Sequence, residues 1–365
     1  MALYVYKFGG SSLATSKHIQ HVASNIQKAR ADGDQVVVVV SAMGGETNRL
    51  VSLASGVAPE SRGRDFAALV TCGELMSMSL LTLTLQSQGC PAKSFKAGEA
   101  GIYTTDEFDC AQITEIHPHA ILAALERGEV PVVAGFQGVN ADGEITTLGR
   151  GGSDATAVAL TNALGAQECR LYTDVLGVYS VDPALMPDVA CLPFIRADEM
   201  LALSEGGARI MQSYALELAI CYSVPVRIMP TFATSEGTKL IYQGEPAFQG
   251  LRFGLSFRTE DGDSLINHAL ERFDITQAER FIMMTIVHRE LLRSNDFSVK
   301  LLNLLKNKGI KIFAQSVSTI ALSALIKEND VRLAAALFQS PDVLKSALAV
   351  DQMGAETKKI FCETV

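Results

Sequence analysis

The sequence lacks the features that mark several large classes of protein. It has no block of Lys and Arg residues, and its 40 acidic against 31 basic residues give a net charge of −9. A chain without a positive patch is not expected to bind nucleic acid as its main role. Its longest apolar runs, such as residues 36–40, fall far short of the roughly 18 residues of a membrane-spanning helix. We expect a soluble protein in which any bound anion is held by a local site.

Paired cysteines and a targeting segment are also missing from the pattern. The seven cysteines are odd in number and form no Cys-x-x-Cys motif, which is typical of a reducing cytoplasm. The N-terminus has no basic start, long apolar centre and cleavage site of the kind found in signal peptides. A length of 365 residues with 48% apolar residues predicts about two domains with buried cores.

Short β-branched runs alternate with longer helical patterns along the chain. The expected strands are residues 3–8, 35–41, 92–95, 130–134, 169–173 and 226–228. The expected helices are residues 17–31, 67–88, 113–127, 155–164 and 211–222. This alternation predicts an α/β fold with a mostly parallel sheet between layers of helices. Ligands of such sheets bind at the carboxyl ends of the strands, so the turns that follow strands are the candidate sites.

The first such turn reads KFGGSS at residues 7–12. Adjacent glycines after a strand let backbone N–H groups approach a ligand, and the N-terminus of the next helix favours phosphate. Lys7 would lie beside that anion. The turn is neither a Walker A loop nor a dinucleotide motif. For this hexapeptide alone, a tight turn with a surface lysine is an equally good interpretation.

Three further turns carry polar residues. The second reads SAMGGETN at residues 41–48, and the fourth, at residues 173–183, mixes carboxylates with an aromatic ring in a way that suits a nucleotide's sugar and base. The third, at residues 146–154, places Arg150 among three glycines, which offers a fork for a carboxylate or phosphate. Helix capping could explain Ser153 and Asp154 but not the arginine, so a functional role is favoured.

Taken with the CGELMS segment at residues 72–77, these blocks resemble the amino-acid kinase family and, within it, the aspartate kinases, over about residues 3–242. The resemblance implies transfer of the ATP γ-phosphoryl group to the side-chain carboxylate of L-aspartate. The product would be 4-phospho-L-aspartate, the first intermediate of the aspartate-derived amino-acid pathway. The resemblance also implies the amino-acid kinase fold and a homodimer.

A carboxylate acceptor is already ionised at pH 7, so the reaction needs charge neutralisation and alignment of two anions rather than a strong base. Lys7 and the amides of Gly9, Gly10 and Ser11 would stabilise the transferring phosphoryl group. Asp154 is negative and would instead orient the lysine or a metal-bound water. Mg²⁺ is expected to bridge the nucleotide phosphates with mostly water ligands.

The resemblance also assigns the substrate sites. Thr47, Glu74, Arg150 and Ser153 would surround aspartate, with Glu74 on the α-ammonium and Arg150 on a carboxylate. Phe136 and Thr147 would line the pocket. The candidates for nucleotide binding are Thr173, Asp174, Tyr179, Asp182 and Arg209.

The nucleotide side departs from the family pattern at three places. Arg209 stands where a lysine is usual, residues 211–213 read Met-Gln-Ser where His-Pro is frequent, and Ala184 replaces a basic residue. All three departures lie in the segments expected to bind the nucleotide.

The pattern of expected strands and helices changes after residue 245. We expect a catalytic domain at residues 1–245, a connection at 246–279, and one ACT-like regulatory or dimerisation domain at 280–365 in βαββα order. Residues 341–365 are too few for a second copy, so inhibition by lysine or threonine is not expected. Two alternatives remain: a kinase of the same fold with another amino acid or small carboxylate as substrate, and a catalytically silent ligand sensor.

Overall fold

The computed structural model describes residues 2–181, 183, 186, 188–206, 208, 210–243, 252–257, 281–288, 295–318 and 320–339. It divides the chain into two compact units. The N-terminal unit comprises Met1–Val178, Leu192–Ala197 and Met211–Gly244. The C-terminal unit comprises Tyr179–Cys191, Asp198–Ile210 and Glu245–Val365. Two internal segments of the expected catalytic domain thus belong with the C-terminal unit.

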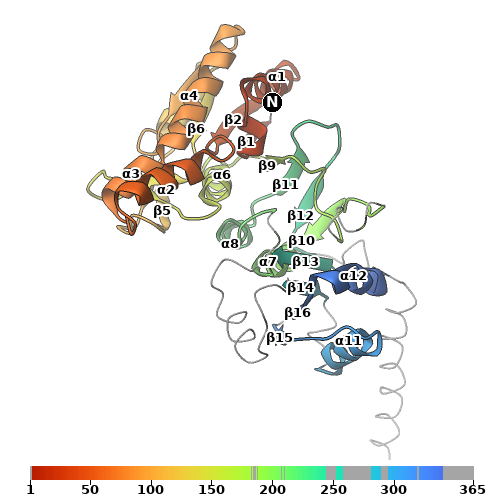
Figure 1. Ribbon diagram of the computed structural model, residues 1–365. Coiled ribbons are helices and arrows are strands. Elements are labelled where there is room, and N and C mark those ends of the chain that lie inside the picture. The colour runs from red at the N-terminus through yellow and green to blue at the C-terminus, as the bar shows by residue number, and fades with distance from the viewer. Residues whose placement is uncertain are drawn as a thin grey trace, which may run out of the picture. The chain divides into compact units, whose positions relative to one another are not determined.

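An eight-stranded sheet forms the centre of the N-terminal unit (Figure 1). Its strand order is β10-β12-β11-β9-β1-β2-β6-β3. The strands are β1 (Leu3–Phe8), β2 (Gln35–Val40), β3 (Ala92–Phe95), β6 (Val130–Ala134), β9 (Glu168–Thr173), β10 (Phe194–Arg196), β11 (Val226–Pro230) and β12 (Thr238–Ile241). All neighbours pair in parallel except β11 and β12, which pair antiparallel. The expected α/β fold with a mostly parallel sheet is confirmed.

Helices cover this sheet because its central strands are apolar on both faces. The five valines of β2 are all buried. Helices α1 (Ser16–Ala31) and α4 (Cys72–Ser87) share one hydrophobic core with β1, β2 and β6. Helices α5 (His119–Glu126) and α6 (Gly152–Ala163) also pack against sheet strands, and α8 (Ser213–Tyr222) packs on α6. Three more helices, α2 (Glu46–Val57), α3 (Arg64–Val70) and α7 (Ala197–Glu205), complete the described helices of residues 1–243.

One helical stretch, Arg64–Ser87, combines α3 and α4 and is long and apolar enough, by length and composition, to cross a membrane. Half of its most apolar 18-residue stretch is buried inside the protein. Helix α4 packs against α1, β3 and β6, and it buries the acidic residue Glu74. Its Met78, Leu81 and Leu85 are part of the core of the N-terminal unit, whereas Met76, Leu80 and Leu83 are exposed.

A second, four-stranded sheet has the order β5-β4-β7-β8. It consists of β4 (Ile102–Thr104), β5 (Ile113–Ile116), β7 (Gln137–Val139) and β8 (Ile145–Thr147). The expected helix over residues 113–127 is wrong for its first four residues, which form β5. Pro118 explains the break, because the residue before a proline is disfavoured in helical conformation, and α5 begins only at His119.

The C-terminal unit contains an antiparallel sheet of order β13-β14-β16-β15. Its elements are β13 (Arg252–Phe257), β14 (Phe281–Val287), α11 (Asn295–Asn307), β15 (Ala314–Val317), β16 (Ala321–Lys327) and α12 (Val331–Gln339). From β14 onward the order is βαββα, as expected of an ACT-like unit. The expected connection at residues 246–279 contains strand β13, so part of it belongs to the folded unit. Residues 341–365 lie outside the described residues.

Candidate active site

A cavity of about 570 Å³ opens where strands β1 and β2 and helix α6 meet, within the N-terminal unit. Its lining includes most of the residues expected around the acceptor and the phosphoryl group: Lys7, Gly10, Thr47, Glu74, Phe136, Thr147, Arg150, Ser153 and Asp154. These residues come from segments up to 147 positions apart in the sequence. The parallel sheet brings them together because the carboxyl ends of its strands share one edge.

Lys7 and Asp154 form an ion pair inside this cavity. The Lys7 Nζ lies 2.6 Å from Asp154 Oδ1, and the two side chains are 14% and 9% exposed. Lys7 is the fifth residue of β1, whereas Asp154 lies in the first turn of α6. The carboxylate therefore fixes the direction of the lysine side chain, while the ammonium remains at the cavity wall.

The glycine turn after β1 differs in detail from the expectation. The Gly9 amide donates a hydrogen bond to the Tyr172 carbonyl oxygen (3.3 Å), so it ties the turn to β9. A short 3₁₀ helix, η1 (Ser11–Leu13), follows, and α1 begins only at Ser16. The N-terminus of α1 is therefore not directly at the glycines.

Gly10 is required by the close approach of two turns. A Cβ atom at Gly10 would lie 2.9 Å from the Ala42 carbonyl oxygen and 3.4 Å from Gly44, in the turn that follows β2. The two glycine-containing turns thus pack directly against each other. Their glycines have a packing role in addition to any contact with a ligand.

The loop around Arg150 is also set by backbone geometry. Gly151 has φ +74°, and a Cβ atom there would lie 2.2 Å from the Gln212 side chain. Gln212 is one of the residues at which the sequence departs from the family pattern, and the structure places it against this loop. Arg150 is exposed and lines the cavity, and no hydrogen bond or ion pair of its side chain is found within the described part of the chain.

Glu74 is one of the residues that line the cavity, and it is only 3% exposed. Its Oε1 accepts a hydrogen bond from the Ala42 amide (3.0 Å), and its Oε2 is buried without a partner among the described residues. Burial raises the pKa of this carboxyl to about 7, against a smaller opposing effect of the Ala42 amide. A cationic group in the cavity would supply the missing partner.

Phe136 and Thr147 form part of the wall. Phe136 has φ +69°, a left-handed conformation that is strained for a residue with a side chain. Its amide donates to Thr156 Oγ1 (3.2 Å), and its carbonyl accepts from the Leu148 amide (2.9 Å). The Thr147 hydroxyl lies 3.0 Å from the carbonyl oxygens of Phe108 and Asp109 and donates to this pair.

Three residues that the sequence did not point to also line the cavity: Arg62, Phe66 and Asp109. The Asp109 Oδ2 accepts from the Gly63 amide (3.3 Å), and its Oδ1 is buried without a partner among the described residues. The Arg62 guanidinium lies 5.9 Å from the centre of the Phe66 ring. None of the three follows a parallel strand, so the search of strand-end turns missed them.

The candidates for nucleotide binding are more dispersed. Thr173 and Asp174 lie at the end of β9 in the N-terminal unit, and the Thr173 hydroxyl donates to Asp174 Oδ1 (3.1 Å). Tyr179 belongs to the C-terminal unit. Asp182 and Arg209, as well as Ala184, lie outside the described residues.

The fold and the cavity are those of a particular class of protein, and comparison with known proteins identifies that class. A model of the amino acid kinase family matches residues 2–230. The chain belongs to the amino acid kinase family.

The relatives compared with this chain within this family carry the more specific name of aspartate kinase or aspartokinase. It is 42% identical over 262 residues to an aspartate kinase of Pseudomonas putida, covering 72% of this chain and 64% of the relative. It is 44% identical over 259 residues to an aspartokinase of Pseudomonas aeruginosa, covering 69% and 63% of the two chains. The chain thus spans less than two thirds of the length of these relatives.

Solved structures agree on the fold. The aspartate kinase from Synechocystis is 29% identical, with a TM-score of 0.60 over 95% of this chain and 70% of that one. E. coli aspartokinase III, solved in complex with aspartate and ADP, is 20% identical with a TM-score of 0.71 over 91% and 98% of the two chains. At that identity the second likeness supports the fold alone.

Proposed function

We propose that this protein is an ATP-dependent aspartate kinase that forms 4-phospho-L-aspartate. The observation that carries the proposal is a single cavity that holds the Lys7–Asp154 ion pair together with Glu74 and Arg150. Lys7 provides a positive charge for the phosphoryl group. Glu74 and Arg150 provide a negative and a positive side chain for the ammonium and a carboxylate of the amino acid. The names of relatives at 42–44% identity support the same activity.

In this proposal the acceptor binds through complementary charges. The buried Oε2 of Glu74, which lacks a partner among the described residues, accepts from the α-ammonium, and Arg150 binds a carboxylate through two N–H groups. Thr47, Ser153, Phe136 and Thr147 shape the rest of the pocket. The side-chain carboxylate would then face Lys7.

The phosphoryl group is stabilised by positioned charge rather than by a base. Lys7, held by Asp154, neutralises charge that develops on the equatorial oxygens. Since the Gly9 amide is engaged with Tyr172, the amides of Gly10 and Ser11 are the donors that this turn offers. Ser11 is an exposed residue, and in this proposal its amide donates to the nucleotide.

ATP and Mg²⁺ complete the proposed site. Thr173, Asp174, Tyr179, Asp182 and Arg209 are the nucleotide residues that we propose. The described residues contain no group of three or more His, Cys, Asp or Glu side chains suited to a metal ion. In our proposal Mg²⁺ is held by the nucleotide phosphates and water ligands, and its charge offsets that of the phosphates.

The assignment is tested by trapping the product. The protein is incubated with ATP, Mg²⁺ and one amino acid at a time, and the acyl phosphate is converted to a hydroxamate with hydroxylamine. We expect hydroxamate with aspartate and none with glutamate or asparagine. Hydroxamate with glutamate alone would identify a kinase of the same fold with another acceptor, and binding of ATP without any product would indicate a silent sensor.

We further propose that the enzyme acts in the cytoplasm as a homodimer and that its C-terminal unit is an ACT-like regulatory or dimerisation domain. The βαββα order from β14 to α12 supports the second point. Sedimentation or light scattering of the full chain would test the dimer.

A further inference from the structure

Thr231 is a buried residue that none of the sequence motifs includes. It follows β11 at the start of the loop that leads to β12, and it is only 2% exposed. Its hydroxyl lies 2.6 Å from the hydroxyl of Ser12, which is fully buried. Because the two residues are 219 positions apart in the sequence, this contact joins distant parts of the N-terminal unit.

The backbone of Thr231 makes two further connections. Its amide donates to the Thr173 carbonyl oxygen at the end of β9 (2.7 Å). Its carbonyl accepts from His21 Nε2 (2.9 Å) and Asn25 Nδ2 (3.2 Å) of α1. Thr231 thus joins the segment after the glycine turn, the end of β9 and the first helix through its own polar groups.

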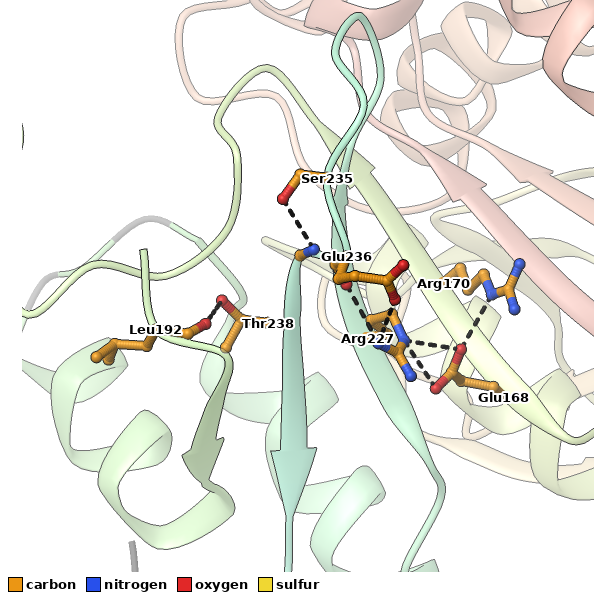
Figure 2. Close-up of polar contacts among 8 residues, drawn as sticks. Glu168, Arg170, Leu192, Arg227, Ser235, Glu236 and Thr238 are labelled. Atoms are coloured by element: carbon orange, nitrogen blue, oxygen red, sulfur yellow. Dashed lines mark hydrogen bonds and ion pairs between the residues drawn. The ribbon is translucent and has the colours of Figure 1, made fainter. Parts of the chain in front are cut away.

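The hairpin that carries Thr231 is itself anchored to the sheet, as Figure 2 shows. Arg227 of β11 donates to both carboxylate oxygens of Glu168 on β9 (3.1 Å each), and Glu168 also accepts from Arg170 (3.0 Å). Arg227 also donates to the Glu236 carbonyl oxygen across the hairpin (3.2 Å). The position of Thr231 is therefore fixed independently of its contact with Ser12.

Ser12 lies in η1, immediately after the turn that offers the Gly10 and Ser11 amides. A donor aimed at a phosphoryl group is effective only if its position is fixed before the reaction. We propose that Thr231 is a positioning residue for phosphoryl transfer: its hydroxyl holds Ser12 and thereby fixes the glycine turn relative to β9. This inference rests on the proposed function, which it extends by a residue that acts through Ser12.

The test replaces the hydroxyl while keeping the size of the side chain. Thr231→Val leaves the buried Ser12 hydroxyl without this partner. Such a loss typically changes an equilibrium constant by a factor of roughly 10. We expect kcat/KM for ATP to fall about tenfold, the aspartate KM to stay within about twofold of the unchanged enzyme, and Thr231→Ser to restore activity. Ser12→Ala should have the same effect, and the double variant should be no worse than the single ones.

Thr104→Val is a matched control. Thr104 and Thr146 form the same kind of buried hydroxyl pair at 2.6 Å, but in the small sheet. Thr104→Val should lower the melting temperature about as much as Thr231→Val does. It should leave kcat/KM for ATP unchanged.

Two outcomes would overturn the proposal: unchanged ATP kinetics in Thr231→Val, or equal losses for ATP and aspartate with no rescue by serine. If Thr231→Val does not fold, Ser12→Ala and Thr231→Ser still decide between these outcomes. Calorimetric binding of ATP to the unchanged protein and to each variant keeps the test separate from the acceptor. An unchanged protein that binds ATP but forms no aspartyl hydroxamate refutes the proposed function, whereas an active unchanged protein whose kcat/KM for ATP is the same in Thr231→Val and Ser12→Ala refutes the positioning role.

Discussion

The acceptor side and the nucleotide side of the proposed site are built differently. Most of the proposed acceptor and phosphoryl residues line one cavity of the N-terminal unit, where strand-end turns and the first turn of α6 meet, and only Gly9 and Ser11 are not in its lining. The nucleotide candidates are divided: Thr173 and Asp174 belong to the N-terminal unit, whereas Tyr179 belongs to the C-terminal unit.

This difference follows from the topology. A parallel sheet fixes where its strands end, so short turns after β1 and β2 have little freedom in direction. The segment after β9 is longer, and Val181 is buried (1%) in the same hydrophobic core as Ile282 and Phe297 of the C-terminal unit. The turns after β1 and β2 therefore adjoin a core of the N-terminal unit, whereas Val181 in the segment after β9 belongs to a core of the C-terminal unit.

Lys7→Ala should have the largest effect on the acceptor side. Loss of a key electrostatic group lowers kcat by on the order of 10²-fold or more, and the aspartate KM should change much less. Steady-state kinetics with both substrates measure this, with the exposed Lys17→Ala on α1 as the control. A variant with near-normal kcat would leave Lys7 as a structural lysine of the turn.

Arg150→Ala should separate the two substrates. A bidentate, charge-assisted contact is worth about 1.5–3 kcal/mol, so the aspartate KM should rise roughly 10- to 100-fold with little change for ATP. The exposed Arg127→Ala, whose ion pair with Glu129 is remote from the cavity lining, is the control. Equal losses for both substrates would contradict a site that holds the acceptor alone.

The pH dependence of aspartate binding should follow Glu74. Burial raises its pKa to about 7, and only the ionised form pairs fully with an ammonium. Aspartate affinity should therefore be constant above about pH 8 and fall by roughly tenfold per unit below pH 7. Isothermal titration between pH 5.5 and 8.5 measures the profile.

Glu74→Gln is the control for that profile: it should bind aspartate more weakly and without this pH dependence. The raised pKa also means that the free protein loses stability from this group as pH rises from about 4.5 to about 7. Since 2.5 units correspond to about 3 kcal/mol, Glu74→Gln should raise the melting temperature at pH 8 but not at pH 4.5. A pH-independent affinity in the unchanged protein would remove Glu74 from the ammonium site.

Val181→Ala should have the smallest effect, and it addresses the nucleotide side. Two buried methyl groups contribute roughly 1.5 kcal/mol to the C-terminal core, and part of this loss should appear as an ATP KM raised about threefold. Val331→Ala removes a valine of similar burial from α12 in the same core. It should lower the melting temperature similarly without affecting the ATP KM. Identical kinetics in both variants would separate the segment after β9 from nucleotide binding.

Much of the central sheet could be predicted from the sequence. The bounds of β1, β3 and β6 are as expected, and those of β2, β9 and β11 differ by one or two residues. These strands are dense in buried β-branched or apolar residues, which is a strong local signal. The small sheet was missed because its strands have three or four residues each and follow the preceding strand with no helix between them. The alternation of strands and helices that marked the equally short β3 is therefore absent there. Strand β13 was missed for a different reason: Gly254 and the glycines around it favoured a connection.

The site could be predicted where chemistry and topology coincide. Lys7, Arg150 and Asp154 stand in glycine-rich turns next to strand or helix ends, so sequence and structure point to the same cavity. Asp109 and Arg62 come from irregular segments whose direction depends on tertiary contacts, such as the Gly63–Asp109 hydrogen bond. No local pattern encodes such contacts.

The strained backbone of Phe136 has a consequence for protein engineering. Most changes to a pocket wall lower stability, because a cavity replaces packed atoms. At Phe136 the left-handed backbone is held by Thr156 and Leu148, and glycine adopts that conformation without strain. Phe136→Gly would widen the acceptor pocket and release this strain at once, so the loss of packing is partly offset. The position is therefore a favourable starting point for an enzyme that accepts bulkier amino acids.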